Sequence, residues 1–126
     1  MTTMRIVLAS LIALAGAAGG AAAADGYPVS GRWTYADAAE SGPAPECRKP
    51  TMEFRGAQRL DQGSGVPSYR NLRVEQSSST TYRVVDEFFN VMIRGRVGYT
   101  LLIRDKDHLR IDYDRGGKSV LLRRCA

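Results

Sequence analysis

The sequence predicts an all-β domain, a small antiparallel meander of about eight strands that forms a closed or nearly closed barrel. Short segments of alternating apolar and polar residues follow one another along the chain. Segments rich in Gly, Pro, Ser and Asp separate them, and no convincing amphipathic helix lies between them. Each strand then has one apolar face, and a closed sheet buries those faces and removes unpaired edges.

The first 24 residues have the pattern of an export signal. Arg5 supplies a positive charge, an apolar run from Ile6 to Ala15 follows, and small residues lead to Ala22-Ala23-Ala24. This order is typical of a cleaved signal peptide, and the apolar run is too short to span about 30 Å of hydrocarbon. We therefore expect a signal peptide over residues 1–24, a single β domain over residues 25–126, and a periplasmic or secreted location. No cysteine lies at the cut to carry a lipid anchor.

The first half of the domain contains three predicted strands and two predicted loops. The strands are Gly31–Tyr35, Thr51–Arg55 and Tyr69–Gln76, and the loops are Ala36–Glu46 and Gln58–Ser68. Alternation places Trp33 with Tyr35 on one face. It likewise places Met52 with Phe54, and Leu72 with Val74.

The second half is expected to hold the remaining strands. They are Thr80–Phe88, Val91–Arg96, Tyr99–Arg104, Leu109–Tyr113 and Ser119–Cys125. Gly95 and Gly98 separate the second of these from the third. Arg115–Lys118 is expected to form a tight hairpin, because Gly116 and Gly117 accept the positive φ that such turns require.

Two cysteines, Cys47 and Cys125, predict one disulfide. An even cysteine count in an exported chain favours a disulfide. A metal or catalytic pair would need neighbouring ligands, but His108 is the only histidine and no C-x-x-C occurs. We expect no cofactor and no bound metal. The disulfide would close a loop of roughly 80 residues, worth at most about 4–5 kcal/mol in loop-closure entropy.

Gly31-x-Trp33 at the start of the first strand, the meander, and an arginine on the last strand resemble the lipocalin and calycin pattern. The resemblance implies that Trp33 closes one end of the barrel. It also implies that Arg123 or Arg124 packs across the indole and hydrogen-bonds to the start of the first strand. Arg124 is the better candidate, because it shares a strand face with Val120 and Leu122. A guanidinium can stack on indole and still reach backbone carbonyls.

Charge and aromatic residues indicate possible partners. The net charge is +5, but the arginines are interleaved with Asp and Glu, which is typical of a solvated surface. We expect a monomer that is not transmembrane, with an envelope protein or an acidic polymer as partner and no nucleic acid. Phe88 and Phe89 are neighbours that face opposite sides of a strand. One of them is expected to face outward, or to lie where the strand ends at Asn90. The pair is a candidate docking surface, and a bulge or a plug at the end of the barrel is the alternative.

These observations favour a non-catalytic exported binding protein, with inhibition of an envelope enzyme as one form. Its rim and the loops Ala36–Glu46 and Gln58–Ser68 would hold the partner. An interior filled by side chains favours a protein or polymer over an enclosed ligand.

Two alternatives stay open. One is an envelope hydrolase, which needs His108 and two carboxylates in one cleft. Asp112 and Asp114 are expected instead to face water and pair with arginine. The other alternative is a structural envelope-stress protein that contacts anionic glycan or lipid.

Overall fold

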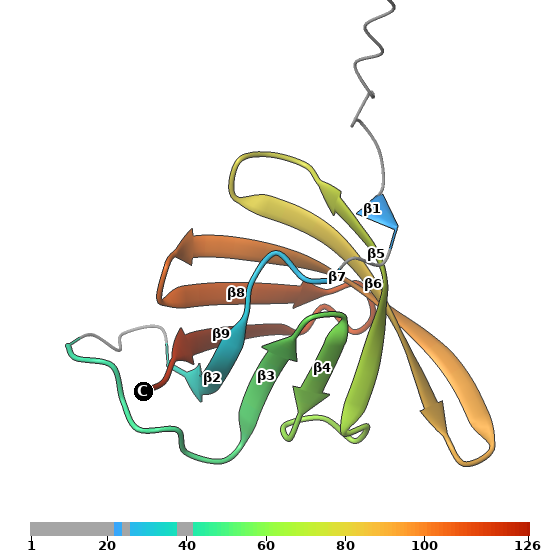
Figure 1. Ribbon diagram of the computed structural model, residues 1–126, viewed down its shortest axis with the longest axis horizontal. Helices are drawn as coiled ribbons and strands as arrows, with labels where there is room; N and C mark the ends of the chain where they lie inside the picture. The colour runs from blue at the N-terminus through green and yellow to red at the C-terminus, as the bar shows by residue number, and fades with distance from the viewer. Residues whose placement is uncertain (1–21, 24–25, 38–41) are drawn as a thin grey trace, which may run out of the picture.

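The computed structural model describes residues 22–23, 26–37 and 42–126, which form strands, turns and loops without a helix (Figure 1). The strands are β1 (Ala22–Ala23), β2 (Gly31–Ala36), β3 (Thr51–Arg55), β4 (Gln58–Asp61), β5 (Ser68–Gln76), β6 (Thr81–Asn90), β7 (Ile93–Asp105), β8 (His108–Tyr113) and β9 (Ser119–Arg124). Within the described ranges, no helix is long and apolar enough to cross a membrane.

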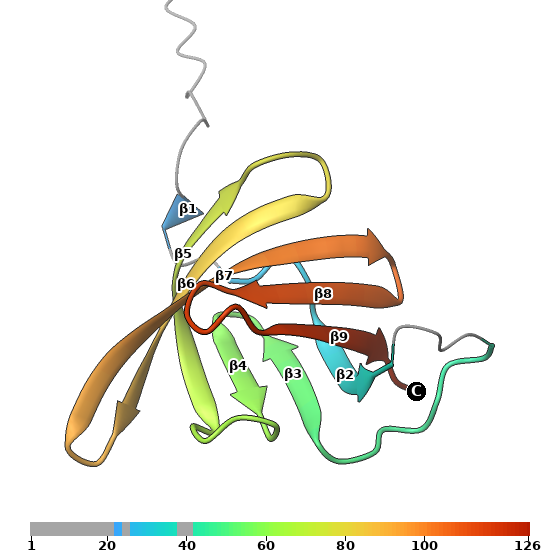
Figure 2. The ribbon, with the colours of Figure 1, turned by 180° about the vertical axis from the view of Figure 1, so that it is seen from behind.

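Strands β2 to β9 form a closed antiparallel barrel (Figure 2). Each strand pairs with the next along the chain, and β9 returns to pair with β2. At this seam Trp33 is opposite Arg124, and Tyr35 is opposite Leu122. The predicted all-β class, the eight-strand meander and the closure are therefore confirmed.

The short strand β1 lies within the segment that the sequence assigns to the signal peptide. Ala22 pairs with Val74 and Ala23 with Arg73 on β5. The rest of that segment, the cut after residue 24 and residues 38–41 of the Ala36–Glu46 loop lie outside the described residues. Cleavage stays a prediction.

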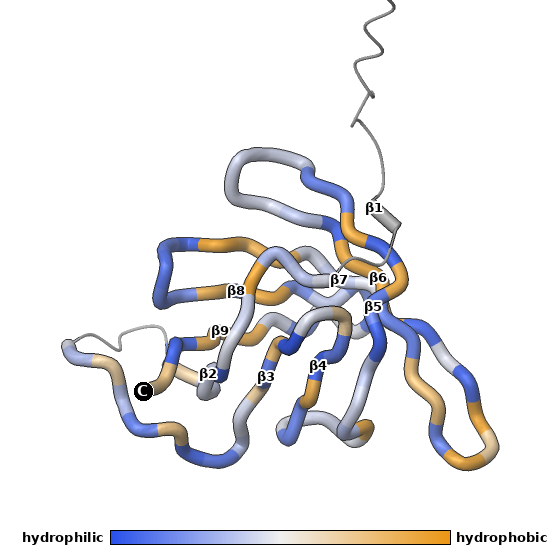
Figure 3. The backbone as a smooth tube through the Cα atoms, viewed as in Figure 1, coloured by the Kyte–Doolittle hydropathy of each residue, from blue (hydrophilic) through white to orange (hydrophobic). Residues whose placement is uncertain are grey.

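Alternation along the strands builds the apolar core. Its buried members are Trp33, Met52, Phe54, Val84, Tyr99, Leu101, Leu109, Ile111 and Leu122. Figure 3 shows apolar positions distributed along the barrel strands and a separate apolar group at the turn between β6 and β7. Most core residues occupy alternate positions, because neighbouring residues of a strand face opposite sides of the sheet.

Two predicted boundaries and one predicted strand face are wrong. The expected loop Gln58–Ser68 begins with β4, in which charged residues occupy inward positions. The expected strands Val91–Arg96 and Tyr99–Arg104 are one strand, β7, because β6 pairs with it without interruption through Gly95 and Gly98. In β5, a register shift between Asn71 and Arg73 buries Asn71 in place of Leu72.

Cys47 and Cys125 form the predicted disulfide. It joins the segment before β3 to the residue that follows β9. The neighbouring backbone reinforces this link, since Cys125 N–H donates to Arg32 C=O at 3.2 Å and Ala126 N–H donates to Pro45 C=O at 2.9 Å. The end of the last strand is thus fixed to the opposite side of the seam.

Candidate functional site at the open end of the barrel

One end of the barrel is closed by Trp33 and Arg124. The Arg124 guanidinium carbon lies 4.4 Å from the centre of the Trp33 ring. Both side chains also donate to the Ser30 carbonyl, each at 3.1 Å. Arg123, the other candidate from the sequence, instead donates to the carbonyls of Gly42 and Pro43. The geometry matches what the lipocalin resemblance implies for Trp33 and Arg124.

Gly31 makes this closure possible. Its φ is +90°, and a Cβ at this position would lie 2.8 Å from Nη1 of Arg124. Only glycine adopts such a backbone conformation without strain. The first residue of the Gly-x-Trp pattern therefore leaves the space in which the guanidinium stacks.

A buried ion network lies inside the barrel. Arg59 of β4 donates from Nε to Asp86 Oδ2 at 2.9 Å and from Nη1 to Asp61 Oδ2 at 2.9 Å. Tyr99 donates its hydroxyl to Asp86 at 2.8 Å, and the Asn71 amide donates to the same carboxylate at 3.1 Å. The side chains of all three charged residues are at most 1% exposed. Their mutual contacts offset the cost of removing charge from water.

Aromatic rings enclose this network. The Arg59 guanidinium lies 4.0 Å from the centre of the Tyr69 ring and 5.1 Å from that of Tyr99. Tyr35 donates its hydroxyl to Asp61 at 2.6 Å, and burial together with this bond raises the pKa of Tyr35 above its ordinary value. Nη2 of Arg59 is buried and has no hydrogen-bond partner among the described residues. The rings and the ion network fill the interior at this level of the barrel.

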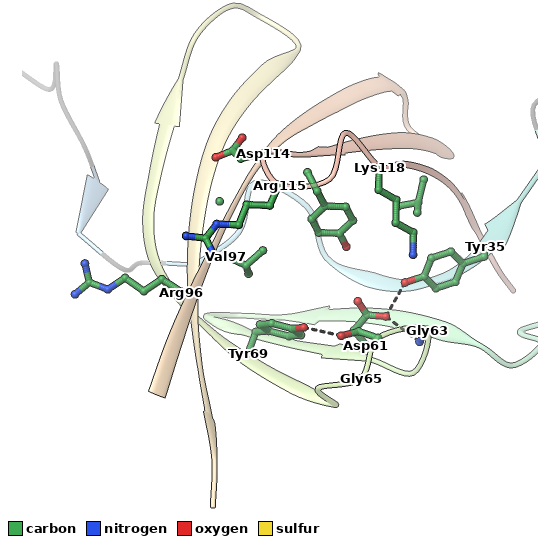
Figure 4. A pocket seen from close by; sticks show the side chains of 14 residues that line it. Tyr35, Asp61, Gly63, Gly65, Tyr69, Arg96, Val97, Asp114, Arg115 and Lys118 are labelled. Atoms are coloured by element: carbon green, nitrogen blue, oxygen red, sulfur yellow. Dashed lines mark hydrogen bonds between the residues drawn. The ribbon is translucent and has the colours of Figure 1, made fainter. Parts of the chain in front are cut away.

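Above the network the barrel opens into a cavity of about 380 Å³ (Figure 4). Its lining comes from the ends of β2, β4 and β8, from the starts of β5, β7 and β9, and from adjacent loops. The lining residues are Tyr35, Asp61, Gly63, Ser64, Gly65, Tyr69, Arg96, Val97, Gly98, Tyr113, Asp114, Arg115, Lys118 and Val120. We call this cavity the mouth. Its volume lies near the lower end of the range for small-molecule sites.

Three cations surround the mouth. Arg96 belongs to β7, whereas Arg115 and Lys118 belong to the hairpin between β8 and β9. All three are exposed, and none forms an ion pair within the part of the chain that the structure describes. The two carboxylates of the mouth are already engaged by other arginines, because Asp61 binds Arg59 and Asp114 binds Arg83. The rim therefore offers uncompensated positive charge to an anion.

The Arg83–Asp114 pair fixes one side of the rim. Two nitrogen–oxygen contacts of 2.7 Å join the side chains. These hydrogen bonds lower the pKa of Asp114 below its ordinary value. Gly98 permits the approach, since a Cβ there would lie 2.5 Å from Asp114 Oδ2. Asp112 pairs separately with Arg110 at 2.8 Å. Both carboxylates thus carry the arginine partners that the sequence suggests.

His108 lies at the other end of the barrel, where β8 begins. Its Nδ1 is 2.8 Å from Asp105 Oδ1, and it does not line the mouth. The hydrolase alternative needs two carboxylates in one cleft with His108. Asp107 also lies at this end, where its carboxylate is 3.6 Å from Nε of Arg124, whereas Asp61 and Asp114 line the mouth at the opposite end. No group of three or more metal-binding side chains occurs among the described residues.

Phe88 and Phe89 do face different environments. Phe88 packs edge-on against Tyr69, with ring centres 5.8 Å apart, and covers Gly95. Phe89 is 68% exposed. The two rings also line a surface groove of about 510 Å³ beside β4 and β5. Phe88 is thus half-buried and Phe89 exposed, and a docking role for the pair stays a prediction.

The buried residues Arg59, Asp61 and Asp86 do not stand out in the sequence. A signal exists for Asp86, because Tyr82, Val84 and Asp86 follow one alternating face. Arg59 and Asp61 alternate in the same way within the expected loop. Charged residues at inward positions of β4 and β6 indicate a buried pair only once both strands are known to pair with β5.

Comparisons with protein-family models, curated proteins and solved structures find no match to this chain. The class of protein is therefore defined by the fold alone. The protein is an eight-stranded antiparallel β-barrel with one closed end, one open end and one disulfide, and it is compatible with a lipocalin-like fold.

Proposed function

We propose that this protein is an exported, non-catalytic binding protein whose mouth holds a small amphipathic anion. The observation that carries the proposal is the uncompensated charge of Arg96, Arg115 and Lys118 around a tyrosine-lined cavity. The apolar body of such a ligand would pack against the tyrosine rings, Val97 and Val120. Its carboxylate or other anionic group would lie among the three cations at the rim.

The rest of the barrel supports binding in preference to catalysis. Arginines already engage both mouth carboxylates, so neither is free to act as a general base. The buried Arg59 network makes a rigid floor, which favours a preformed site. The signal-like N-terminus and the disulfide support export.

The test measures displacement of the fluorescent anion anilinonaphthalene sulfonate from the folded protein. Octanoate, octanol and octylamine share one apolar chain and differ in the charge of the head group. We expect octanoate to displace the probe at lower concentration than octanol, and octylamine to be the weakest. Equal displacement by octanoate and octanol would contradict the anion preference.

Three variants locate the site. Arg115→Gln with Lys118→Gln removes two rim cations and should weaken octanoate binding by about tenfold, since exposed charge contacts are each worth up to about 1 kcal/mol. Arg104→Gln with Lys106→Gln removes two exposed cations at the closed end and should leave binding unchanged. Val97→Trp should block the cavity. If the two double variants bind alike, the mouth is not the site.

A further inference from the structure

The hairpin between β6 and β7 extends beyond the barrel wall. The pairing of β6 with β5 ends at Glu87 opposite Arg70, and the pairing of β7 with β8 begins only at Tyr99. Between these points the two strands pair only with each other, from Phe88 opposite Gly95 to Asn90 opposite Ile93. Figures 1 and 2 show this ribbon leaving the barrel on its own.

The end of this ribbon is apolar and exposed. Every exposed large hydrophobic residue of the described chain lies here: Phe89 at 68%, Val91 at 85%, Met92 at 90% and Ile93 at 61%. We call these four residues the tip. Phe89 shares a ribbon face with its partner Arg94, whereas Ile93 shares the other face with Asn90. The tip is therefore apolar on both faces.

The turn residues are not those that the turn itself favours. Val91 has φ +36°, a conformation that is strained for a β-branched residue. Two-residue hairpin loops favour Gly or Asn at such a position, followed by a small polar residue or Gly. Val91 and Met92 weaken the turn and add exposed apolar surface, so local structure does not account for their presence.

Positive charge lies directly behind the tip. Arg94 and Arg96 follow Ile93 on β7, and neither forms an ion pair within the described ranges. No acidic residue occurs from position 88 to position 104. At about 3.4 Å per residue, Arg96 lies roughly 10 Å behind Ile93, which is comparable with the depth to which interfacial segments enter a bilayer.

We propose that the tip inserts into the interface of a lipid bilayer that contains anionic lipid, with Arg94 and Arg96 at the level of the head groups. Two observations favour a bilayer over a protein partner. A protein surface would cover one face of the ribbon, whereas acyl chains surround a protrusion on both faces. The arginines behind the apolar residues also match the order of charge and hydrocarbon at an anionic membrane surface.

The first experiment is co-sedimentation of the protein with vesicles, either of phosphatidylcholine alone or of phosphatidylcholine with phosphatidylglycerol. We expect binding to the anionic vesicles that decreases as salt is raised. Val91→Gly with Met92→Ser removes half of the tip and introduces residues that the turn favours. Because the turn should be retained or improved, loss of binding by at least tenfold would reflect lost insertion rather than lost fold.

A matched pair of charge variants tests the arginines. Arg94→Gln should weaken vesicle binding by about fivefold, the effect of one cation near an anionic surface. Arg104→Gln removes one exposed cation from the far end of the same strand, about 30 Å away along a strand of regular rise. It should leave binding close to that of the unchanged protein. Arg96 is not used, because it also lines the mouth.

A second experiment places a reporter at the tip. Met92→Trp should show quenching by brominated lipids, whereas Trp33, which is 1% exposed, should not. The unchanged protein is therefore the internal control.

Three outcomes would overturn the proposal. They are absence of binding to both kinds of vesicle, equal vesicle binding by the Val91→Gly/Met92→Ser variant, and self-association of the unchanged protein that this variant abolishes. The last would identify a second copy of the chain as the occupant of the tip. Anion binding in the mouth is measured without vesicles, so its failure is distinguishable from failure of membrane binding.

Discussion

Arg124 on the last strand stacks on Trp33 of the first barrel strand and donates to the same Ser30 carbonyl as the indole. One contact thus joins the two strands of the seam and covers one end of the barrel. It depends on the absence of a side chain at Gly31, and this dependence can be measured.

Gly31→Ala should lower the free energy of unfolding by about 2–3 kcal/mol. The substitution strains the backbone at positive φ and displaces Arg124 from its hydrogen bond and its stacking. Gly116→Ala is the matched control, because Gly116 has φ +78° but nothing lies within 4 Å of its Cβ position. It should cost about 1–2 kcal/mol, for the backbone alone. Equal losses in urea denaturation would show that the contact with Arg124 is unimportant.

Arg59→Met should destabilise the fold by about 3–5 kcal/mol, because it leaves Asp61 and Asp86 buried without their cation. Arg55→Met removes an exposed arginine, 65% accessible, from its pair with Glu53. That change should cost less than about 1 kcal/mol. Chemical denaturation of both variants provides the comparison. Similar costs would mean that the buried network contributes no more than a surface pair.

Loss of the disulfide should be costly because its sequence separation is 78 residues. The double substitution Cys47→Ser with Cys125→Ser should lower the free energy of unfolding by up to about 4–5 kcal/mol. Reduction of the unchanged protein should produce a similar loss, which separates loop closure from any effect of the serine side chains. An unchanged denaturation midpoint in both cases would contradict this prediction.

Stability should fall as pH rises above about 10, the ordinary tyrosine pKa. Burial raises the pKa values of Tyr27, Tyr35 and Tyr99 in the folded protein. Above that pH the unfolded chain loses protons that the folded chain keeps, so the unfolded state is favoured. Tyr35→Phe should make this decline shallower. Urea denaturation at a series of alkaline pH values measures the free energy of unfolding. If this free energy fell equally steeply with pH in both proteins, the raised pKa of Tyr35 would not contribute to the decline.

Local alternation is sufficient to predict most of the barrel wall. Met52 and Phe54, or Leu109 and Ile111, are buried because each is the apolar member of an alternating pair, and this pattern can be seen within a few residues. The disulfide is predictable for a similar reason, since only two cysteines are present. The Gly-x-Trp pattern adds the closed end, through a resemblance rather than through periodicity.

The open end is less predictable. Arg59 and Asp86 are separated by 27 residues and meet because β4 and β6 both pair with β5, so that their inward side chains converge beside that strand. In the sequence, an inward arginine on a short strand has the same appearance as an arginine in a polar loop. The rim cations are hard to predict because nothing in the sequence separates them from other surface charges. Arg115 and Lys118 appear as ordinary hairpin charges until the fold places Arg96 at the same opening.

The Trp33–Arg124 closure makes the two ends of the barrel different. With that end sealed, a molecule held in the mouth has a single route in and out, so association and dissociation share one passage. The β6–β7 hairpin leaves the barrel at the open end, where Arg96 and Val97 of β7 line the mouth. If the tip of this hairpin held the barrel at a membrane, the anion proposed for the mouth would enter and leave on the side that faces the lipid.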